Sequence, residues 1–401
     1  MKAVILAAGE GKRMRPLTYE RPKVMLPIAG KPIIEHLLEA VMEVGIADFV
    51  FVIGYHNETI RDYFGKGERW GINIDYVTQK AQLGTADALS RTEGLVNDKF
   101  IMLNGDTVVH AEDIKKVINS DTNITIGVTE VTNPVDYGVV ETEGKRITKI
   151  HEKMRHPISN LVNAGVYLLD ESIFEVLSKT EKSERGEFEL TDSLQLLIES
   201  GEAISWKKIK HWLDVSYPWD LLAVNKDLIA KINHVNKGEL EDNVCVKGKV
   251  SIGEGTLIKS GSYIEGPVFI GDNCEIGPNS YIRANTAIGN NCHVGNAVEI
   301  KNSIIMDVTK IPHLSYVGDS VIGSRCNLGA GTKIANLRFN NATVKAKGMD
   351  TGRRKLGAII SDGVKTGINA SIDAGTVIGN NTLIGPNTFA SGYIVKNSRI
   401  Y

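Results

Sequence analysis

The sequence predicts two parts: an α/β domain with a mostly parallel sheet, followed by a parallel β-helix of hexapeptide repeats. Up to about residue 228, short apolar runs of strand length alternate with amphipathic helical runs, as in an α/β layer. Beyond residue 240 an aliphatic residue returns every six positions, a period typical of a parallel β-helix. We therefore expect the first domain over 1–228, a linker over 229–241 and the β-helix over 242–401.

The first part shows its elements in short segments. Two segments carry apolar residues on one helical face, 32–45 and 188–200, and the first ends at Gly45, a residue type favoured at helix C-termini. Ligands of such folds bind beyond the carboxyl ends of the strands, so we expect a site where the first and third strands end. The apolar runs of strand length are 2–8, 48–55, 99–106 and 124–131.

The second part is defined by its repeat. A small residue follows most of the repeated aliphatic residues by four positions and suits a tight corner. The phase breaks between Ile300 and Ile322, a gap of 22 residues where 18 or 24 would keep the register, so we expect an interrupting loop that carries His313. A second break, 335–359, is rich in Lys and Arg. The in-phase residues are Val246, Ile252, Ile258, Ile264, Ile270, Ile276, Ile282, Ile288, Val294 and Ile300.

Composition excludes several classes of protein. The formal net charge of −2 gives no reason to expect a nucleic acid or an anionic membrane as partner. No stretch reaches the roughly 18 apolar residues of a membrane helix, and the chain opens on a strand, not on a secretion signal. The four cysteines have no CxxC spacing. We expect a cytoplasmic protein.

The most informative short stretch is 6–16, LAAGEGKRMRP. It matches neither the dinucleotide fingerprint, which needs glycine at Met14, nor the Walker phosphate loop, which needs Ser or Thr at Arg13. A strand that enters a glycine-rich turn still offers backbone N–H groups to a phosphate. The cations that follow, Lys12, Arg13 and Arg15, add the charge that a triphosphate requires.

The motifs of both parts together resemble the bifunctional sugar-1-phosphate nucleotidylyltransferase and amino-sugar-1-phosphate acetyltransferase family. The resemblance covers nearly the whole chain and implies a Rossmann-like nucleotidyltransferase domain, a left-handed β-helix and small-molecule substrates. Because the predicted helix is triangular and has basic breaks in its walls, we also expect a homotrimer. The motifs are LAAGEGKRMRP, RPKVMLPIAGKP, QLGTADAL, NGD, DYGVV, HEK, VNAGVY, WLDVSYPWDLL, IPHLSYVGDS and NLGAGTKIAN.

The resemblance assigns roles in the first domain. Arg13 and Lys23 would hold the phosphates while a sugar-1-phosphate oxygen attacks the α-phosphorus of UTP or dTTP. Asp106 and Asp214 suit Mg²⁺, which accepts one or two protein carboxylates together with phosphates. Asp214 stands where uridylyltransferases tend to have Asn, which leaves the nucleotide open. The nucleotide would be held by Leu6, Ala7, Ala8, Gly9, Gly11, Gln79, Gly84 and Thr85, and the sugar and its phosphate by Gly138, Glu152, Lys153 and Asn163.

The resemblance also assigns an acetyltransferase site to the β-helix. His313 would be the general base that takes a proton from the amine as it attacks acetyl-CoA, a role for which imidazole is suited near neutral pH. Lys345 would replace a lysine that the family has at the position of Ala342. The chain ends soon after the last repeat, so we expect any C-terminal arm over the coenzyme to be short. Sugar-phosphate contacts would come from Arg283, Lys301 and Tyr316, and contacts around the amine and thioester from Asn327 and Asn336.

Three other classes of protein share parts of this pattern. A γ-type carbonic anhydrase needs three histidines for zinc, and the predicted helix has only His293 and His313. A mannose-1-phosphate guanylyltransferase with a purely structural β-helix has no need for His313 together with Arg283 and Lys301. A non-catalytic sugar-nucleotide-sensing regulatory subunit should have lost a phosphate or metal residue, and none is lost. The sugar, GlcNAc-1-phosphate or glucose-1-phosphate, and the amino sugar, such as glucosamine-1-phosphate, stay open.

Overall fold

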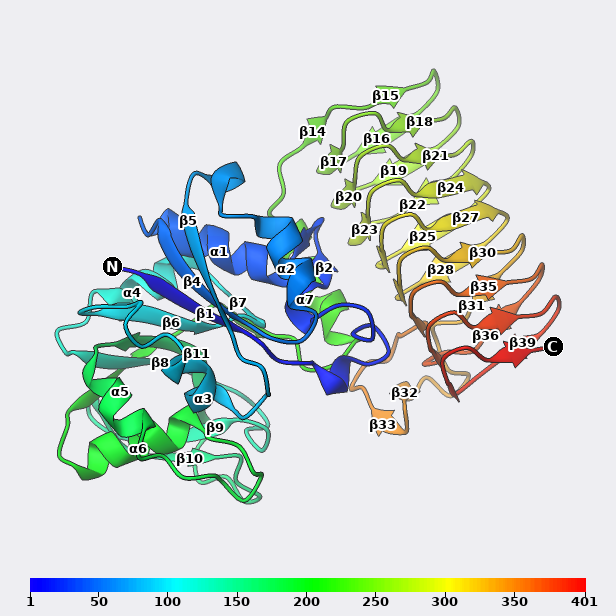
Figure 1. Cartoon of the computed structure of the whole chain (residues 1–401). Helices are drawn as coiled ribbons and strands as arrows, with labels where there is room; N and C mark the ends of the chain where they lie inside the picture. The colour runs from blue at the N-terminus through cyan, green and yellow to red at the C-terminus, as the bar shows by residue number, and fades with distance from the viewer. The chain divides into compact units, whose positions relative to one another are not determined.

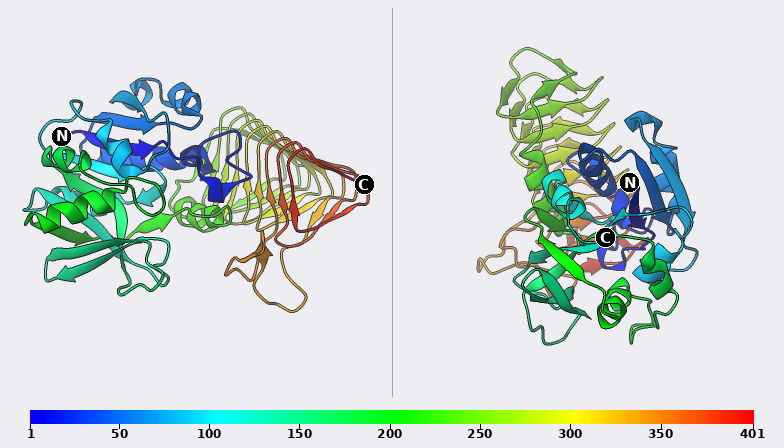
Figure 2. Two further views of the ribbon diagram at one scale, coloured as in Figure 1. Left: turned by 60° about the horizontal axis from the view of Figure 1, so that its bottom comes forward. Right: turned by 90° about the vertical axis from the view of Figure 1, so that its left-hand side faces the viewer.

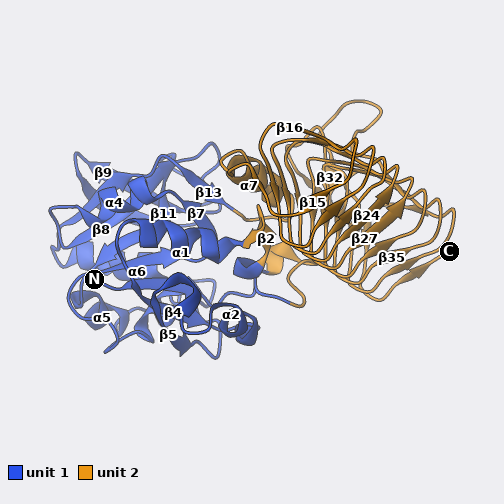
Figure 3. Ribbon diagram, turned by 90° about the horizontal axis from the view of Figure 1, so that it is seen from above, with its two compact units in different colours: residues 1–11, 21–25, 32–214 blue, residues 12–20, 26–31, 215–401 orange.

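The computed structural model describes residues 1–401, and the chain divides into two compact units (Figure 3). Unit 1 comprises 1–11, 21–25 and 32–214, and unit 2 comprises 12–20, 26–31 and 215–401. Two short N-terminal segments thus belong to the same unit as the β-helix. None of the helices combines the length and the apolar character that a membrane span requires.

Unit 1 is an α/β layer around one nine-stranded sheet (Figure 1). The strand order is β5-β4-β1-β6-β11-β8-β12-β10-β9, and the first four strands are parallel. Successive side chains of the first strand enter opposite cores: Ile5 packs with the core that contains helix α1, and Val4 with the core that contains α6. The strands are β1 (Ala3–Ala7), β4 (Asp48–Ile53), β5 (Asn73–Thr78), β6 (Phe100–Asn104), β8 (Ile124–Glu130), β9 (Gly138–Glu143), β10 (Arg146–Glu152), β11 (Leu161–Leu169) and β12 (Ile204–Lys208).

Helices cover both faces of this sheet, so the predicted α/β architecture is confirmed. The expectation of a mostly parallel sheet was wrong, because β11, β10 and β9 pair antiparallel with their neighbours. The α-helices of unit 1 are α1 (Ile33–Glu43), α2 (Asn57–Phe64), α3 (Thr85–Ser90), α4 (Ala111–Ile118), α5 (Ser172–Leu177) and α6 (Leu190–Glu199). A separate two-stranded ribbon joins β7 (Thr107–Val109) to β13 (Trp212–Asp214). Short 3₁₀ turns are η1 (Lys12–Met14), η2 (Lys23–Met25) and η3 (Glu68–Trp70), and a small hairpin joins β2 (Pro27–Ile28) to β3 (Lys31–Pro32).

Unit 2 contains helix α7 (Asp220–Ile229) and a left-handed parallel β-helix with three walls, whose stacked coils are seen in Figures 1 and 2. Wall 1 consists of β14 (Val235–Asn236), β17 (Val250–Ile252), β20 (Val268–Ile270), β23 (Thr286–Ile288), β26 (Ile304–Ile305), β29 (Val321–Ile322), β34 (Ile359–Ile360), β37 (Val377–Ile378) and β40 (Tyr393–Ile394). Wall 2 consists of β15 (Glu239–Leu240), β18 (Leu257–Ile258), β21 (Glu275–Ile276), β24 (His293–Asn296), β27 (Lys310–His313), β30 (Asn327–Leu328), β35 (Lys365–Thr366), β38 (Leu383–Ile384) and β41 (Arg399–Ile400). Wall 3 consists of β16 (Cys245–Lys247), β19 (Tyr263–Glu265), β22 (Tyr281–Ile282), β25 (Glu299–Lys301), β28 (Tyr316–Gly318), β31 (Lys333–Ile334), β36 (Ser371–Ile372) and β39 (Phe389–Ala390).

The repeated aliphatic residues form the interior of this helix, as the period of six predicts. Ile252, Ile270 and Ile288 pair in register up wall 1 and are almost fully buried. The small residues buried at the corners include Cys274 and Cys292. The segment 229–241, which we expected to be a linker, already contains β14 and β15, and both pair with the next coil.

The first phase break is not an inserted loop, so this expectation was wrong. Between Ile300 and Ile322 the interior positions are Ile305, Ile311 and Val317, all buried. The successive steps from Ile300 to Ile322 are five, six, six and five residues, so that each coil here has 17 residues, one fewer than 18. Because a shortened corner absorbs the missing residue, the walls continue unbroken, and His313 is the last residue of strand β27.

The second break is a true excursion from the β-helix. Val321 pairs directly with Ile359, 38 residues later, whereas other coils take 17 or 18, so about 20 extra residues leave the β-helix between β31 and β34. Part of this excursion forms a hairpin of β32 (Lys345–Ala346) and β33 (Met349–Asp350), drawn in orange in Figure 1.

Candidate active sites

The predicted nucleotide loop leaves the end of β1 between two glycines. The N–H of Gly105 donates to the carbonyl of Leu6 at 2.9 Å, and the N–H of Tyr55 donates to that of Ala8 at 3.2 Å. A Cβ at Gly105 would lie 2.8 Å from the Leu6 oxygen, and one at Gly54 2.8 Å from the Ala8 oxygen. Neither glycine was singled out in the sequence, although each directly follows a strand; together they fix the start of the loop.

The segment predicted to contact the base is held in place by hydrogen bonds with other residues of the chain. Buried Gln79 donates from Nε2 to the carbonyl of Gly84 at 3.0 Å and to Asp87 Oδ2 at 2.7 Å. Thr85 Oγ1 accepts the N–H of Leu190 at 2.9 Å. Gly84 has φ of 110°, and a Cβ there would lie 2.3 Å from the Phe188 carbonyl oxygen. Since both amide hydrogens of Gln79 are used inside the protein, its structural contribution is to hold the loop before α3.

Charged residues gather at the carboxyl end of β6. Lys23 Nζ lies 2.7 Å from Asp106 Oδ2, and the lysine side chain is almost fully buried. Asp214 pairs with Thr107 in the ribbon of β13 and β7, which brings the second predicted metal ligand beside the residue that follows Asp106. Tyr137 Oη donates to Asp214 Oδ2 at 3.1 Å.

This donor set fits Mg²⁺. The ion takes hard oxygen ligands and in phosphate-transfer sites commonly binds one or two carboxylates, completing its shell with phosphates and water. Asp106 is partly exposed, so its carboxylate is accessible to an ion. Throughout residues 1–401, no group of three or more His, Cys, Asp or Glu side chains is arranged to hold a metal. A site of two carboxylates that depends on substrate oxygens is consistent with this arrangement.

Arg13 was grouped with Lys23 by sequence, but the two residues belong to different compact units. Arg13 lies in η1, and its guanidinium is 5.6 Å from the ring centroid of Tyr217, which is also in unit 2. This cation–π contact orients the side chain within unit 2.

The residues predicted to hold the sugar converge at the start of β9 and the end of β10. Gly138 pairs directly with Glu152, and a Cβ at Gly138 would lie 3.3 Å from Glu152 Oε2. Thr191 Oγ1 donates to the same carboxylate oxygen at 3.0 Å. Lys153, with φ of 46°, holds its ammonium 3.5 Å from Glu152 Oε1. Asn163 lies at the irregular point of β11, where its Oδ1 accepts the N–H of Gly165 at 2.9 Å.

Two neighbours of Glu152 were not predicted from the sequence. Arg185 contacts Glu152 at 3.5 Å and the buried Glu189 at 2.8 Å. Burial, and then the nearby Glu152 carboxylate, raise the pKa of Glu189 to about 6, while the Arg185 guanidinium opposes this shift. Arg185 lies in a loop, and Glu189 directly precedes α6. Neither residue belongs to a distinctive sequence pattern, so neither could be predicted.

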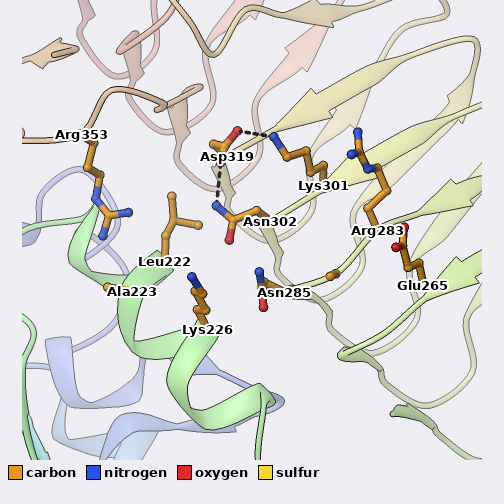
Figure 4. A pocket seen from close by; sticks show the side chains of 11 residues that line it. Leu222, Ala223, Lys226, Glu265, Arg283, Asn285, Lys301, Asn302, Asp319 and Arg353 are labelled. Carbon is orange, nitrogen blue, oxygen red and sulfur yellow. Dashed lines mark hydrogen bonds and ion pairs between the residues drawn. The ribbon is translucent and has the colours of Figure 1, made fainter. Parts of the chain in front are cut away.

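In unit 2 a cavity of about 490 Å³ lies between α7 and the corner that follows wall 3 (Figure 4). Of the predicted acetyltransferase residues it is lined by Arg283 and Lys301. Arg283 pairs with Glu299 at 2.9 Å, and Lys301 lies 3.5 Å from Asp319. Two further cations line the same cavity: Lys226 of α7, which the sequence did not single out, and Arg353, which was noted only as one of the basic residues of the second break.

Asp319 connects the predicted residues of this site. Its carboxylate is buried and accepts Nδ2 of Asn302 at 2.6 Å and Nδ2 of Asn336. Asn336 also donates to Tyr316 Oη at 3.2 Å. Asp319 therefore ties Lys301, Asn336 and Tyr316 into one cluster, although the sequence analysis passed over it within the motif YVGDS.

The remaining predicted residues lie elsewhere on the β-helix. His313 is exposed at the end of wall 2, and its carbonyl accepts Ser315 Oγ at 2.8 Å and the N–H of Gly331 at 3.0 Å. Asn327 is on wall 2 and Lys345 is in the hairpin of the excursion, and both are exposed. None of these three residues lines the cavity.

Comparisons with known proteins agree with the two-part structure. The family profile described as Nucleotidyl transferase matches residues 2–231, and the one described as GMPPB C-terminal domain matches residues 264–366. The "Bifunctional protein GlmU" of Methanococcus maripaludis is 44% identical over 100% of this chain and 97% of its own length. The "Bifunctional sugar-1-phosphate nucleotidylyltransferase/acetyltransferase" of Sulfurisphaera tokodaii is 44% identical over 94% of each chain.

Among solved structures, a putative glucose-1-phosphate thymidylyltransferase from Bacillus anthracis superposes with a TM-score of 0.54 at 27% identity. The superposition covers 59% of this chain and 98% of the thymidylyltransferase chain. The matched profile spans more than half of the chain, and the GlmU relatives share its full length and both of its parts. The chain belongs to the nucleotidyl transferase family and, within it, to the bifunctional GlmU proteins.

Proposed function

We propose that this enzyme transfers a nucleotidyl group from UTP or dTTP to a sugar-1-phosphate, releasing pyrophosphate, and also acetylates an amino-sugar-1-phosphate from acetyl-CoA. We assign the first reaction to residues 1–228 and the second to residues 242–401. The observation that carries the first assignment is the contact of Lys23 with Asp106 beside the glycine-rich loop, with Asp214 paired to Thr107. The names of the full-length relatives support both halves.

In the nucleotidyl reaction the two reactants are anions, so positive charge and positioning provide most of the catalysis. Lys23 is a buried ammonium at the strand ends, and a triphosphate would compete with Asp106 for it. Asp106 and Asp214 would hold Mg²⁺, which supplies charge neutralisation at the phosphates when bound. Glu152, fixed by Thr191, would accept hydrogen bonds from sugar hydroxyls.

In the acetyl reaction Arg283 and Lys301 would bind the sugar phosphate, and His313 would remove the proton from the attacking amine. Tyr316 and Asn336, oriented by Asp319, would position the sugar. Since His313, Asn327 and Lys345 do not line the cavity of their own chain, a neighbouring subunit would have to complete the site. The fully exposed Phe339 and the partly exposed Leu337 in the excursion offer apolar surface for that contact.

We therefore propose a cytoplasmic homotrimer. Sedimentation equilibrium at micromolar concentration should give three chain masses, and a monomer would contradict the shared site.

The chemical test is a substrate panel that crosses UTP, dTTP and GTP with GlcNAc-1-phosphate, glucose-1-phosphate and mannose-1-phosphate, with pyrophosphate release as the readout. A second panel follows the CoA thiol with glucosamine-1-phosphate as acceptor. Preference for GTP, or no CoA release with any amino sugar, would refute the respective half of the proposal.

A further inference from the structure

The cavity beside wall 3 is more cationic than the predicted sugar-phosphate contacts explain (Figure 4). Its volume of about 490 Å³ is within the range of small-molecule sites. It is lined by Lys226, Arg283, Lys301 and Arg353 against two carboxylates, those of Glu265 and Asp319. Even when Glu299, the ion-pair partner of Arg283, is counted as a third carboxylate, the cations are in excess, so the lining favours an anionic occupant such as a phosphate monoester.

The four cations differ in whether the protein neutralises them. Arg283 has Glu299 at 2.9 Å, and Lys301 has Asp319 at 3.5 Å. Lys226 and Arg353 form no ion pair and no side-chain hydrogen bond with any residue of the chain, and Figure 4 shows both side chains at the cavity. Arg283 and Lys301 are therefore partly neutralised, whereas Lys226 and Arg353 are available to a ligand.

Arg353 is a half-buried guanidinium. Burial lowers its pKa, an effect that the more distant carboxylates of Asp220 and Asp319 oppose. A guanidinium stays charged in proteins and presents a planar fork of donors that matches phosphate oxygens. Removing such a group partly from water without a partner is unfavourable, and a bound phosphate would relieve that cost.

Lys226 is held at the cavity by its neighbour in sequence. Asn225 is fully buried; its Nδ2 donates to the carbonyl of Asn285 at 2.9 Å, and its Oδ1 accepts the N–H of Ala29 at 2.9 Å. The first bond fastens α7 to a corner of the β-helix that itself lines the cavity, and the second fastens α7 to the turn between β2 and β3. The position of Lys226 at the cavity follows from a fixed backbone, even though its side chain is exposed.

We propose that Lys226 and Arg353 bind the phosphate monoester of the amino-sugar-1-phosphate, completing the phosphate site begun by Arg283 and Lys301. The inference rests on the proposed acetyl transfer, whose acceptor subsite it defines. It makes α7 and the basic excursion part of the acceptor site. Coenzyme A also carries a phosphate monoester, its 3′-phosphate, so the experiment must separate these two sources.

The test compares Lys226→Ala, Arg353→Gln and the double variant with two controls, Lys231→Ala two residues beyond the end of α7 and Arg354→Ala next to Arg353. Because hydrogen bonds to charged groups contribute more than neutral ones, Arg353→Gln should raise KM for glucosamine-1-phosphate about tenfold to a hundredfold, and exposed Lys226→Ala about threefold to tenfold. KM for acetyl-CoA, and nucleotidyl transfer, should stay near wild type. The inhibition constant of inorganic phosphate against the acceptor should rise in parallel with KM.

Two results would overturn the proposal: a double variant whose KM for glucosamine-1-phosphate stays within about twofold of wild type, or one in which only the KM for acetyl-CoA rises. If the wild-type chain transfers no acetyl group, the proposed function fails, and equilibrium dialysis with radiolabelled glucosamine-1-phosphate takes the place of kinetics. The wild-type chain should then bind at the nucleotidyl site and at this one. The double variant should lose one of the two sites, and unchanged stoichiometry and affinity would refute the inference.

Discussion

Replacing Asp319 tests whether the acetyltransferase residues depend on one buried carboxylate. Asp319 has φ of 51° and accepts hydrogen bonds from Asn302 and Asn336 beside Lys301. Asn tolerates this left-handed conformation nearly as well as Asp, so Asp319→Asn removes the charge without straining the backbone. Asp319→Ala removes the acceptors as well and adds backbone strain.

The expected magnitude follows from the hydrogen bonds. The new amide has one oxygen for the two asparagine donors, so one partly buried donor loses its acceptor, at a cost of about 1–3 kcal/mol or less. Lys301 also loses its charge partner. We expect kcat/KM for acetyl transfer to fall about fivefold to a hundredfold in Asp319→Asn, and further in Asp319→Ala.

The assay is steady-state release of the CoA thiol over a range of glucosamine-1-phosphate concentrations. Asp272→Asn is the matched control, because Asp272 accepts the N–H of Glu254 at 2.8 Å at another corner of the β-helix, outside the cavity. That variant should keep wild-type kinetics. An Asp319→Asn enzyme with kcat/KM within twofold of wild type would refute the role of Asp319 in orienting the site.

Three further predictions concern separate groups. Asp106→Ala and Asp214→Ala should each lower nucleotidyl transfer at least about 100-fold, measured by pyrophosphate release, since both are expected to hold the charge-neutralising metal. His313→Ala should lower kcat of acetyl transfer about 10²- to 10⁴-fold, the usual contribution of a positioned general base. Glu189, whose pKa is raised from 4.5 to about 6 chiefly by burial, binds more protons in the folded state between these values. Stability should therefore fall as pH rises through this window, by up to about 2 kcal/mol, and Glu189→Gln should abolish that contribution.

Each of these predictions has an internal control. The metal variants should retain acetyl transfer, and the histidine variant should retain nucleotidyl transfer; full nucleotidyl activity in excess EDTA would contradict the metal assignment. An alanine variant that acetylates at the wild-type rate would leave His313 as a surface residue. For Glu189, thermal midpoints at pH 4.5 and 7 can be followed by tryptophan fluorescence, since Trp70, Trp206 and Trp212 lie in unit 1 and only Trp219 does not. Equal pH shifts in wild type and Glu189→Gln would contradict the raised pKa.

The period of six predicted the β-helix because its geometry forces one interior residue per wall. It failed between Ile300 and Ile322, where shortened corners replace six-residue steps by five. A search for a fixed period interprets a missing corner residue as a break in the repeat. In the structure the corner is one residue shorter, and the strands on either side stay in register. His313 was thus expected in a loop and lies at the end of a regular strand.

Candidate site residues at strand ends can be predicted from the sequence, because parallel strands end at one edge of a sheet. Asp106 and the loop after β1 are of this kind, and the structure brings their strands together. Asp319, Lys226 and Arg353 do not lie at strand ends of this sheet; each reaches the cavity of unit 2 through register or packing that no local pattern encodes. Arg353 arrives from an excursion inserted between paired strands, and Lys226 from a helix fastened by one buried asparagine.

The same limit applies to the domain boundary, which the sequence placed at residue 228 along a linear chain. Segment 12–20 follows the nucleotide loop directly, yet it packs with the β-helix: Glu20 Oε2 lies 2.6 Å from Arg325 Nη2, and its Oε1 accepts Asn380 Nδ2 at 3.1 Å. Ser361 Oγ donates to the Pro16 carbonyl at 2.8 Å. The turn that carries Arg13 is therefore held by residues more than 300 positions later in the chain.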